Sequence, residues 1–497
     1  MDILQLPGKR RDAFVIVCLL AVIAATRWPL APDHLFFFDS INFALALEEF
    51  NPALHQPQPP GYPMFVALTR LLHLGIPSPE AVFLIAGILG AAGAAYFLWR
   101  LAGTAAVVLF VFHPVLIFGG LTNQVRVFYA FAGCGAAWLA WRAWISGHAR
   151  TLLPLGAFLG LAAGFRPTTA LLLFPLLAAA MWRHRGAPRT AACALLLYIA
   201  GICCWLLPVV NVSGGMANYV ALIRGYANEQ FGSSLFYDAP PSEALRMAAA
   251  AIVWPGLGSL AWIWAVPLAD RNRAYARLRP LAPILALWFI PALLFFSLVH
   301  VADPDQSLLM APVYCVLGGL VIETVIEQRG WRRLRPLLLL ALAAFSFYLF
   351  LRPPRGIARA TGYGVIRYMQ RRSSGVFDSL AALRSRGPVQ ILVYQPELTW
   401  RKIAYYERPL PVYVVEGSGH PVWLAQSADR AELPRADDGA YRLRQGQVAV
   451  VMGSSLAPER ESMRDRWRFR EQGPVLWRWL AAGDSFELAG VRFVTVP

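Results

Sequence analysis

The residue best suited to acid–base chemistry is Asp39, which directly follows three phenylalanines, Phe36–Phe38. Apolar residues recur at helical spacing from Asp39 to Phe50 and predict a helix lying in the plane of a membrane interface. A carboxylate that has lost part of its water there is a stronger base, which suits it to take a proton from a hydroxyl group. The alternative is structural, because Asp is a favoured N-cap residue and a helix is expected to begin near Ser40. Both interpretations fit the position of Asp39.

A proline-rich segment, His55–Pro63, follows this helix and carries the polar residues Gln58 and Tyr62. Proline removes a backbone donor and fixes φ, so the segment is expected to form neither helix nor sheet. A second amphipathic helix is predicted over Met64–Leu74. His55, Gln58 and Tyr62 therefore stand on an irregular loop between two interfacial helices.

These residues belong to a chain of 497 residues that is 57% hydrophobic and only 15% charged. A soluble chain carries about 25% charged residues, and the apolar excess extends over the first ~350 positions, as a bundle of bilayer-spanning helices requires. The net charge of +16 would suggest nucleic acid as a partner. The basic residues lie in short loops between apolar runs, however, where they set orientation in a membrane. We therefore expect membrane lipid, and no nucleic acid, as a partner.

Apolar runs predict about eleven transmembrane helices. They cover Ala13–Ala31, Ala81–Leu101, Thr104–Leu121, Val125–Trp144, Leu152–Ala163, Thr168–Trp182, Thr190–Val210, Ala248–Leu268, Leu281–Val299, Leu308–Val325 and Pro336–Leu351. Assigning every second loop to the cytoplasm collects the arginine clusters there: Arg142 with Arg150; Arg183, Arg185 and Arg189; Arg271, Arg273, Arg277 and Arg279; Arg329, Arg332, Arg333 and Arg335. This asymmetry predicts an inner-membrane, multi-pass protein with a cytoplasmic N-terminus and a periplasmic C-terminal domain.

Two of these runs, Leu152–Ala163 and Thr168–Trp182, are short for a span of ~20 residues. They are joined by Gly164–Pro167, which contains Arg166. Because both flanking loops carry cytoplasmic-type arginines, the pair is expected to be a hairpin that barely reaches the outer side. Arg166 is then expected at, or slightly below, the outer interface.

The composition changes near Arg352, and the chain divides into a predicted membrane domain, 1–351, with an external loop over 32–80, and an extracytoplasmic domain, 352–497. Short apolar segments there alternate with helical patterns and predict a small α/β domain with a partly parallel sheet. It contains no glycine-rich phosphate loop and no nucleophile elbow. The six cysteines all lie inside apolar runs without a metal-binding spacing, so we expect buried thiols.

The order of these features resembles the GT-C glycosyltransferases, multispan enzymes that use polyprenyl-phosphate sugars. Protein O-mannosyltransferases and the lipid A aminoarabinose transferase belong to this superfamily. The resemblance covers about residues 10–350. It rests on Phe38–Ser40 after the first span, the Gln58–Pro63 segment, the His113-Pro114 span ending at Thr122–Gln124, the Gly160–Pro167 hairpin, and the His300–Gln306 loop that precedes a late span.

The resemblance implies a role for several residues. Asp39 matches the catalytic carboxylate, which acts as general base, and Arg166 matches a basic residue that binds the lipid phosphate. A guanidinium suits this role, since it offers bidentate hydrogen bonds and keeps its charge when desolvated. An arginine in hydrocarbon costs about 2.5–3.5 kcal/mol on insertion scales, which a phosphate would offset; snorkelling to the interface would offset it equally. Arg126 and Arg224 are candidates for a second phosphate-binding cation.

This chain departs from the family pattern in its acidic residues. Asn123 and Gln124 stand where family members often carry a second acidic residue, so no carboxylate pair remains there to hold Mg²⁺ or Mn²⁺. We therefore predict no metal site and no cofactor, with a divalent metal left as the open alternative.

The resemblance also implies that the loop with His55, Gln58 and Tyr62 binds substrate. A second departure lies in this loop, because Gln58 stands where some members carry a lysine before the Pro-Pro pair. His55 either supplies the missing polar contact or faces solvent. Asp303 and Asp305 either contact the acceptor or end one span and cap the next.

The predicted reaction is transfer of a sugar from a polyprenyl-phosphate donor to an acceptor hydroxyl on the outer face, with inversion at the anomeric carbon and Asp39 as base. The acceptor could be a protein, a lipid or a glycan. Two other classes stay open. A transporter or flippase would place ionisable residues near the bilayer midplane, often in repeated halves, and a non-catalytic envelope-assembly protein would use the external domain to bind a partner.

Overall fold

The computed structural model describes residues 8–230, 240–299, 303–358, 360–396, 398–427, 430–453 and 455–496. Its contacts divide the chain into two compact units. The helical unit comprises the first 32 residues and Asn42–Val365, and the C-terminal unit comprises Asp33–Ile41 together with Ile366–Pro497. The unit boundary thus lies later than the predicted one at 351, and nine residues of the first external loop (33–41) join the C-terminal unit.

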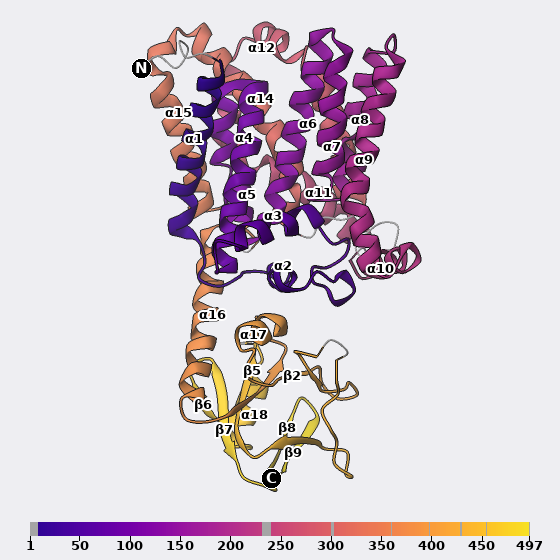
Figure 1. Cartoon of the computed structure of the whole chain (residues 1–497). Helices are drawn as coiled ribbons and strands as arrows, with labels where there is room; N and C mark the ends of the chain where they lie inside the picture. Colours follow the sequence, from indigo (N-terminus) through magenta and orange to yellow (C-terminus); the bar gives the residue numbers. More distant parts are fainter. Residues whose placement is uncertain are drawn as a thin grey trace. The chain divides into compact units, whose positions relative to one another are not determined.

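The helical unit is built from fifteen α-helices in the described residues (Figure 1). They are α1 (Gly8–Arg27), α2 (Phe38–Glu48), α3 (Pro63–His73), α4 (Pro79–Val111), α5 (Pro114–Thr122), α6 (Val127–Ser146), α7 (Leu152–Ala162), α8 (Thr168–Arg183), α9 (Pro188–Val212), α10 (Met216–Gln230), α11 (Pro241–Gly256), α12 (Arg271–Leu278), α13 (Ala282–Leu298), α14 (Ala311–Gln328) and α15 (Arg335–Leu351). The first turn of α2 belongs to the C-terminal unit.

Helix α4 contains a chain reversal at Gly103, where φ is 80° and ψ is −170°. A Cβ atom added to Gly87 would lie 3.3 Å from the carbonyl oxygen of Gly120. Gly87 precedes Gly103 on α4, and Gly120 follows it on α5. At a rise of about 1.5 Å per residue, a straight α4 would carry the chain far from Gly87 before α5 begins. The two predicted runs that meet at Gly103 are therefore two legs of one hairpin, and glycine suits the turn because it tolerates positive φ.

Every predicted apolar run coincides with one or more helices. By length and apolarity alone, six stretches of the described chain can cross a membrane, or seven if α12 and α13, which meet at a bend of 75°, form one span. This number is lower than eleven partly because α4 counts once and because the helices of the hairpin, Ala149–Ala162 and Thr168–Arg183, are short. The predicted fold class, a multi-pass helical membrane protein with a small C-terminal α/β domain, is confirmed, and the count of eleven stays a prediction.

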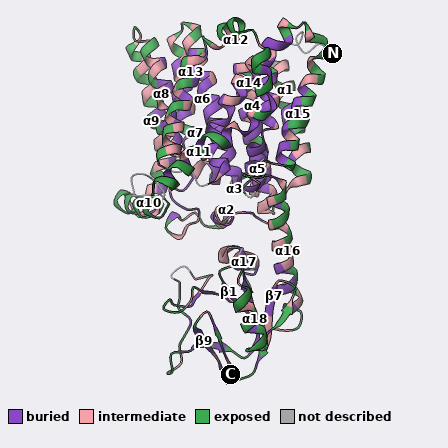
Figure 2. Cartoon of the chain, turned by 180° about the vertical axis from the view of Figure 1, so that it is seen from behind, coloured by how far each residue is buried: buried purple, intermediate pink, exposed green. Residues whose placement is uncertain are grey.

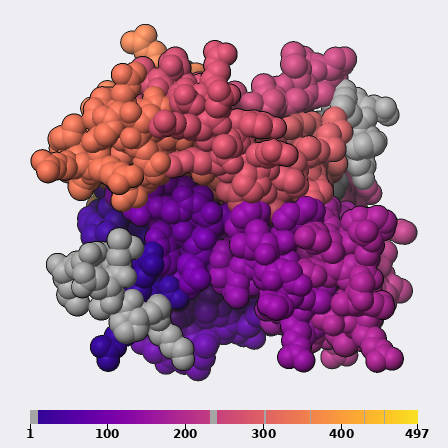
Figure 3. Space-filling model, turned by 90° about the horizontal axis from the view of Figure 1, so that it is seen from above, coloured from indigo at the N-terminus to yellow at the C-terminus, as the bar shows by residue number. Residues whose placement is uncertain are grey.

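The interior of the helical unit is filled by α4, α5, α6 and α14, whose residues are mostly buried (Figure 2). Viewed from the end where α12 lies, the earlier helices (indigo to magenta) lie on one side and the later ones (pink to orange) on the other (Figure 3). Helices α3 and α10 lie at the opposite end, across the direction of the long helices (Figure 1).

The predicted burial of all six cysteines is wrong for most of them. Cys134 and Cys315 are buried, Cys203 is half-buried, and Cys18, Cys193 and Cys204 are exposed on α1 and α9. All lie on apolar helices, where an exposed thiol behaves as a small apolar side chain compatible with lipid.

The C-terminal unit contains two sheets. Strands β1 (Val389–Tyr394), β2 (Val412–Val415), β3 (Trp423–Leu424), β5 (Gly446–Met452), β6 (Arg470–Gln472) and β7 (Val475–Leu480) form a sheet of order β3-β2-β1-β5-β7-β6. In it, β1 pairs in parallel with β2 and β5, as the sequence predicts, and the other pairs are antiparallel. Strands β4 (Tyr441–Arg444), β8 (Ser485–Leu488) and β9 (Val491–Val496) form a second sheet.

Three helices accompany these sheets: α16 (Tyr363–Arg384), α17 (Trp400–Tyr406) and α18 (Ala457–Asp465). Val376, Phe377 and Leu380 of α16 pack with Ile403 of α17 and the apolar residues of β1 in one buried cluster. Helix α17 is thus fixed against the sheet.

Candidate functional site

Arg166 lies in the turn between α7 and α8, and the turn is bound to the start of α3. The backbone N–H of Met64 donates to the carbonyl of Gly164 over 3.1 Å. A Cβ at Gly164 would lie 2.3 Å from Cγ of Met64 and 2.9 Å from the ring of Trp205, so only glycine permits this approach. The hairpin predicted from the sequence is thereby locked to the proline-rich loop.

The guanidinium of Arg166 faces two tyrosines. Its Nη1 donates to the hydroxyl of Tyr62 over 2.6 Å, and its Nε donates to Thr168 over 3.2 Å. The guanidinium carbon also lies 4.9 Å from the centroid of the Tyr129 ring. Tyr62 is buried and adopts a left-handed conformation with φ of 45°. The loop thus turns its side chain toward Arg166.

Arg126 lies beside the same tyrosine. It ends the 3-10 helix η4 (Gln124–Arg126) and is 5% exposed. Its Nη1 donates to the hydroxyl of Tyr129 over 2.9 Å, and its guanidinium lies 5.7 Å from the Tyr129 ring centroid. Two of the three predicted phosphate-binding arginines therefore meet at Tyr129, which the sequence interpretation missed. The signal was the spacing of three residues from Arg126, which places both on one helical face.

Asp305 is fully buried in the 3-10 helix η9 (Pro304–Leu309). A Cβ at Gly119 would lie 3.0 Å from that of Asp305, so the carboxylate packs directly on α5. Asp305 lies near Tyr129, as Arg126 and Arg166 do. The structure therefore gathers Tyr62, Tyr129, Arg126, Arg166 and Asp305 into one group, named here the arginine–tyrosine cluster.

Asp303 occupies the N-cap position of η9 but makes no side-chain cap hydrogen bond. The capping alternative is therefore wrong for Asp303. Residues 300–302, the first part of the predicted late loop, lie outside the described residues.

Gln58 forms a buried pair with Asn42 of α2. Nδ2 of Asn42 donates to Oε1 of Gln58 over 3.1 Å, and both residues are almost fully buried. Oδ1 of Asn42 and Nε2 of Gln58 have no hydrogen-bond partner among the described residues. One acceptor and one donor are left over, and exchanging N and O in both amides gives the same result. A single hydroxyl group, which both donates and accepts, would satisfy them together.

The remaining loop residues lie elsewhere. His55 is half-buried in a left-handed conformation, with its ring 6.0 Å from that of Tyr226 on α10. The hydroxyl of Tyr219, also on α10, donates to the carbonyl of Pro60 over 3.1 Å. Arg224 is exposed on α10, and no contact joins it to the arginine–tyrosine cluster in the described chain.

Asp39 lies in the first turn of α2 and is half-buried. The helix begins at Phe38, so Asp39 is not its N-cap residue and the predicted start near Ser40 is two residues late. A carboxylate in the first turn is favoured by the partial positive charge of the helix N-terminus. By its contacts this turn belongs to the C-terminal unit.

Among the described residues, no three His, Cys, Asp or Glu side chains are grouped as ligands for a metal ion. The arginine–tyrosine cluster instead offers guanidinium and hydroxyl donors, which are groups that bind phosphate oxygens.

Known proteins match the chain in sequence and in fold. It is 26% identical over 394 residues to an undecaprenyl phosphate-α-4-amino-4-deoxy-L-arabinose arabinosyl transferase of Pseudomonas paraeruginosa (strain DSM 24068 / PA7), which covers 70% of this chain and 68% of that protein. The crystal structure of apo ArnT from Cupriavidus metallidurans superposes with a TM-score of 0.55 at 14% identity, covering 94% of this chain and 98% of that one. No family model matches. The predicted resemblance is confirmed: this chain is similar in sequence and in fold to the ArnT-type GT-C transferases, which use polyprenyl-phosphate sugars.

Proposed function

We propose that this protein is a membrane glycosyltransferase that takes a sugar from a polyprenyl-phosphate donor. The observation that carries the proposal is the arginine–tyrosine cluster in a chain similar to ArnT-type transferases. Arg126 and Arg166 converge on Tyr129 from two segments, and both are neighbours of hydroxyl groups. A pair of guanidiniums, that of Arg126 buried and that of Arg166 half-buried, is a favourable environment for a phosphate whose negative charge grows as the sugar leaves.

In the proposed reaction Asp39 removes the proton of an acceptor hydroxyl. The acceptor oxygen forms a bond to the anomeric carbon as the bond from that carbon to the phosphate oxygen breaks. The electron pair leaves with the polyprenyl phosphate, whose charge Arg166 and Arg126 stabilise. Attack from the face opposite the phosphate inverts the anomeric carbon. The proposal uses no metal ion and no other cofactor.

The acceptor is proposed to bind on the outer face of the inner membrane, with the N-terminus cytoplasmic and the C-terminal domain periplasmic. This orientation is supported by the alternation of arginine-rich loops along the chain. Helix α12, which carries three of these arginines, lies at the end of the helical unit opposite to α3 (Figure 1). The acceptor itself is a hydroxyl-bearing protein, lipid or glycan.

We further propose that the Asn42–Gln58 pair binds a hydroxyl group of the donor sugar. Its leftover donor and acceptor match one hydroxyl. The pair is neutral, which suits an uncharged part of the donor.

The test is sugar transfer by the purified, full-length protein. Radiolabelled polyprenyl-phosphate sugars are incubated with it, with and without extracts of candidate acceptors. The proposal expects a labelled acceptor product, and its loss in Asp39→Asn by at least about 100-fold, the range typical of general base catalysis. Asp39→Asn is compared with Asp465→Asn, which changes an exposed carboxylate on α18, at equal membrane level and thermal stability. Transfer by Asp39→Asn at a near wild-type rate would show that Asp39 is not the base. Movement of labelled lipid across vesicles without any product would indicate a flippase instead.

A further inference from the structure

The segment Asp33–Ile41 is far in sequence from the rest of its unit, yet it makes defined contacts with α16 and α17. The backbone N–H of Leu35 donates to the hydroxyl of Tyr406 over 2.8 Å. The ring of His34 lies 4.9 Å from the rings of both Phe377 and Tyr406. The amide of Gln370 donates to the carboxylate of Asp33 over 2.5 Å. The segment is thus anchored along its first half.

The residue directly before Asp39 is held as well. The ring of Phe38 lies 6.0 Å from that of Trp400 in an edge-to-face arrangement, and the guanidinium of Arg401 lies 5.5 Å from the Phe38 ring. Burial, with the nearby charge of Arg430, lowers the pKa of Arg401 to about 10, so Arg401 stays charged at neutral pH. Trp400 and Arg401 form the first turn of α17, whose N-cap Thr399 accepts a hydrogen bond from the N–H of Lys402. The contact to Phe38 therefore comes from a capped, packed helix start.

We propose that α17 of the C-terminal domain is the element that positions Asp39. Tyr406 holds the segment before α2, and Trp400 and Arg401 hold Phe38 in its first turn. The carboxylate of Asp39 thereby keeps one orientation toward the acceptor hydroxyl. This deepens the proposed function, on which the catalytic part of the inference rests. Precise placement matters because a misplacement of about 1 Å in a reacting group can cost about 100-fold in rate.

The contact is tested first without any activity measurement. Hydrogen exchange of the full-length protein is followed by mass spectrometry on peptides that cover 33–41. Tyr406→Phe removes the acceptor of the Leu35 N–H and leaves the ring, so exchange of this segment should be about 5-fold faster, as expected for loss of a bond worth ~1 kcal/mol. Tyr413→Phe, the same change on β2 of the same domain, is the control. Equal exchange in Tyr406→Phe and wild type would overturn the proposal.

Sugar transfer then tests the catalytic part. Tyr406→Phe combined with Arg401→Gln should lower kcat by at least about 10-fold while the KM for the lipid donor stays within about 2-fold. Full activity together with faster exchange of 33–41 would overturn the positioning role, provided that Asp39→Asn is inactive. If Asp39→Asn is itself active, the proposed function fails, and the exchange data still decide whether α17 holds the segment.

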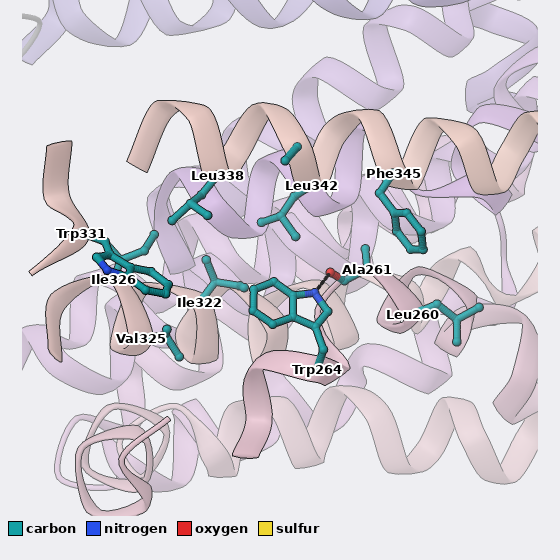
Figure 4. Close-up of a pocket in the computed structure, with 11 residues that line it drawn as sticks. Leu260, Ala261, Trp264, Ile322, Val325, Ile326, Trp331, Leu338, Leu342 and Phe345 are labelled. Atoms are coloured by element: carbon teal, nitrogen blue, oxygen red, sulfur yellow. Dashed lines mark hydrogen bonds between the residues drawn. The ribbon is translucent and has the colours of Figure 1, made fainter. Parts of the chain in front are cut away.

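A separate observation is an apolar cavity of about 250 Å³ in the helical unit (Figure 4). It lies between α14, α15 and two short 3-10 helices, η7 (Leu257–Ala261) and η8 (Ile263–Leu268). Pro267 lies inside η8, where proline disfavours a regular α-helix. The indole Nε1 of Trp264 donates to the carbonyl of Ala261 over 2.7 Å, so its polar atom is already satisfied. The cavity therefore suits an apolar ligand.

The surroundings of the cavity favour a lipid. Three lining residues, Leu260, Trp264 and Phe345, are 45%, 46% and 45% exposed, so the cavity opens at the side of the helical unit. Trp331 of η10 (Trp331–Leu334) also lines it and is followed by Arg332 and Arg333. Both arginines are exposed and form no ion pair in the part of the chain that the structure describes.

The acidic residues on the neighbouring helix α14 already have partners. Arg335 pairs with Glu323 at 2.6 Å, and Arg277 pairs with Glu327, which also feels the charge of Arg332. We infer that the cavity holds one acyl chain of an anionic phospholipid, with the phosphate on Arg332 and Arg333.

The probe is phosphatidylglycerol with a photoreactive group in its acyl chain, diluted into phosphatidylcholine vesicles that contain the full-length protein. Crosslinks should map to α14 and α15 and fall at least about 5-fold in Ala341→Trp, which fills the cavity. The control is Leu340→Trp, the neighbouring exposed position, which does not line the cavity.

Arg332→Gln with Arg333→Gln should remove the preference for labelled phosphatidylglycerol over labelled phosphatidylcholine. Equal labelling in Ala341→Trp and Leu340→Trp would overturn the site. Stronger labelling by a photoreactive polyprenyl phosphate would overturn the choice of a phospholipid.

Discussion

At the scale of single residues, the central feature is a pair of arginines around one tyrosine. Two guanidiniums repel each other, and here both are stabilised by hydroxyl acceptors, Tyr62 for Arg166 and Tyr129 for Arg126. The fully buried Asp305 lies near the same tyrosine. Replacing either arginine with lysine keeps the positive charge but loses these contacts, because lysine cannot reproduce bidentate hydrogen bonds or ring stacking.

We predict that Arg166→Lys raises the KM for the lipid donor by about 10-fold or more, and Arg166→Ala by more again. The reason is that a hydrogen bond to a charged group contributes about 1.5–3 kcal/mol. The measurement is initial transfer rate against donor concentration, with Arg246→Lys, an exposed arginine paired with Glu243, as control. An unchanged donor KM in Arg166→Ala would contradict the phosphate-binding role.

The Asn42–Gln58 pair allows a prediction about the sugar. Donor analogues that each lack one hydroxyl are compared in wild type and in Asn42→Ala. For one analogue, the loss of kcat/KM seen with the wild type should be smaller in Asn42→Ala, because this variant no longer has the Asn42 side chain that pairs with the missing hydroxyl. If every analogue shows the same relative loss in both proteins, the pair is structural.

At the scale of elements, glycines decide how closely helices approach. Gly156 and Gly160 of α7 face the backbone of α9, where a Cβ would lie 2.1 Å from the carbonyl oxygen of Ala194 and 2.3 Å from that of Tyr198. Trp205 of α9 donates its indole N–H to the carbonyl of Gly160 over 2.9 Å. Small residues at such positions let helix backbones pack tightly in a membrane. The contact fixes α7, and with it the turn that carries Arg166.

Gly160→Ala should therefore destabilise the helical unit, since overpacking costs about 1–3 kcal/mol. The expected result is a lower thermal midpoint in detergent, together with weaker use of the lipid donor. Gly186→Ala is the matched control, because nothing lies within 4 Å of a Cβ at that glycine. An equal thermal midpoint for both variants would show that α7 and α9 can separate without cost.

At the scale of the whole molecule, the C-terminal domain carries a carboxylate that is destabilising at neutral pH. Glu407, at the end of α17, is 5% exposed. Burial raises its pKa above the ordinary value of 4.5, and Arg384, at 3.6 Å, opposes this only in part. The folded state therefore binds this proton more tightly than the unfolded state does. The contribution of Glu407 to the free energy of unfolding is therefore fully present below about pH 4.5, the pKa in the unfolded state. It is lost as the pH rises through the higher pKa of the folded state.

Glu407→Gln should raise the thermal midpoint of the C-terminal domain at pH 8 and raise it less at pH 3.5, below the ordinary pKa of 4.5, where the carboxyl is protonated in the folded and the unfolded state. The measurement is thermal unfolding of the full-length protein at both pH values. The control is Glu416→Gln, whose side chain is exposed. A stabilisation of equal size at both pH values would mean that Glu407 does not titrate in this window.

Part of the candidate site could be predicted from the sequence. Arg166, Arg126 and Tyr62 stand in turns or at helix ends beside apolar runs, and these positions follow from local hydrophobicity and from proline and glycine. Tyr129 and Asn42 were not predicted, because both lie inside apolar helices and only their neighbours in space give them polar partners. Arg224 was predicted for the same site but is exposed on α10. This could not be predicted, because a positive charge in the sequence does not indicate which way its side chain points.

The sequence by itself determined the apolar helices, the irregular proline loop and the parallel strands of the C-terminal domain. These depend on hydrophobic period, proline and chain composition, which act over a few residues. Only the tertiary structure decided that Tyr62 meets Arg166 across 104 residues and that Asp33–Ile41 joins α17. Such contacts depend on how glycine-lined helices and aromatic rings pack, and no local pattern specifies them. Asp39 stood out from its sequence alone, and its attachment to the C-terminal domain came from packing.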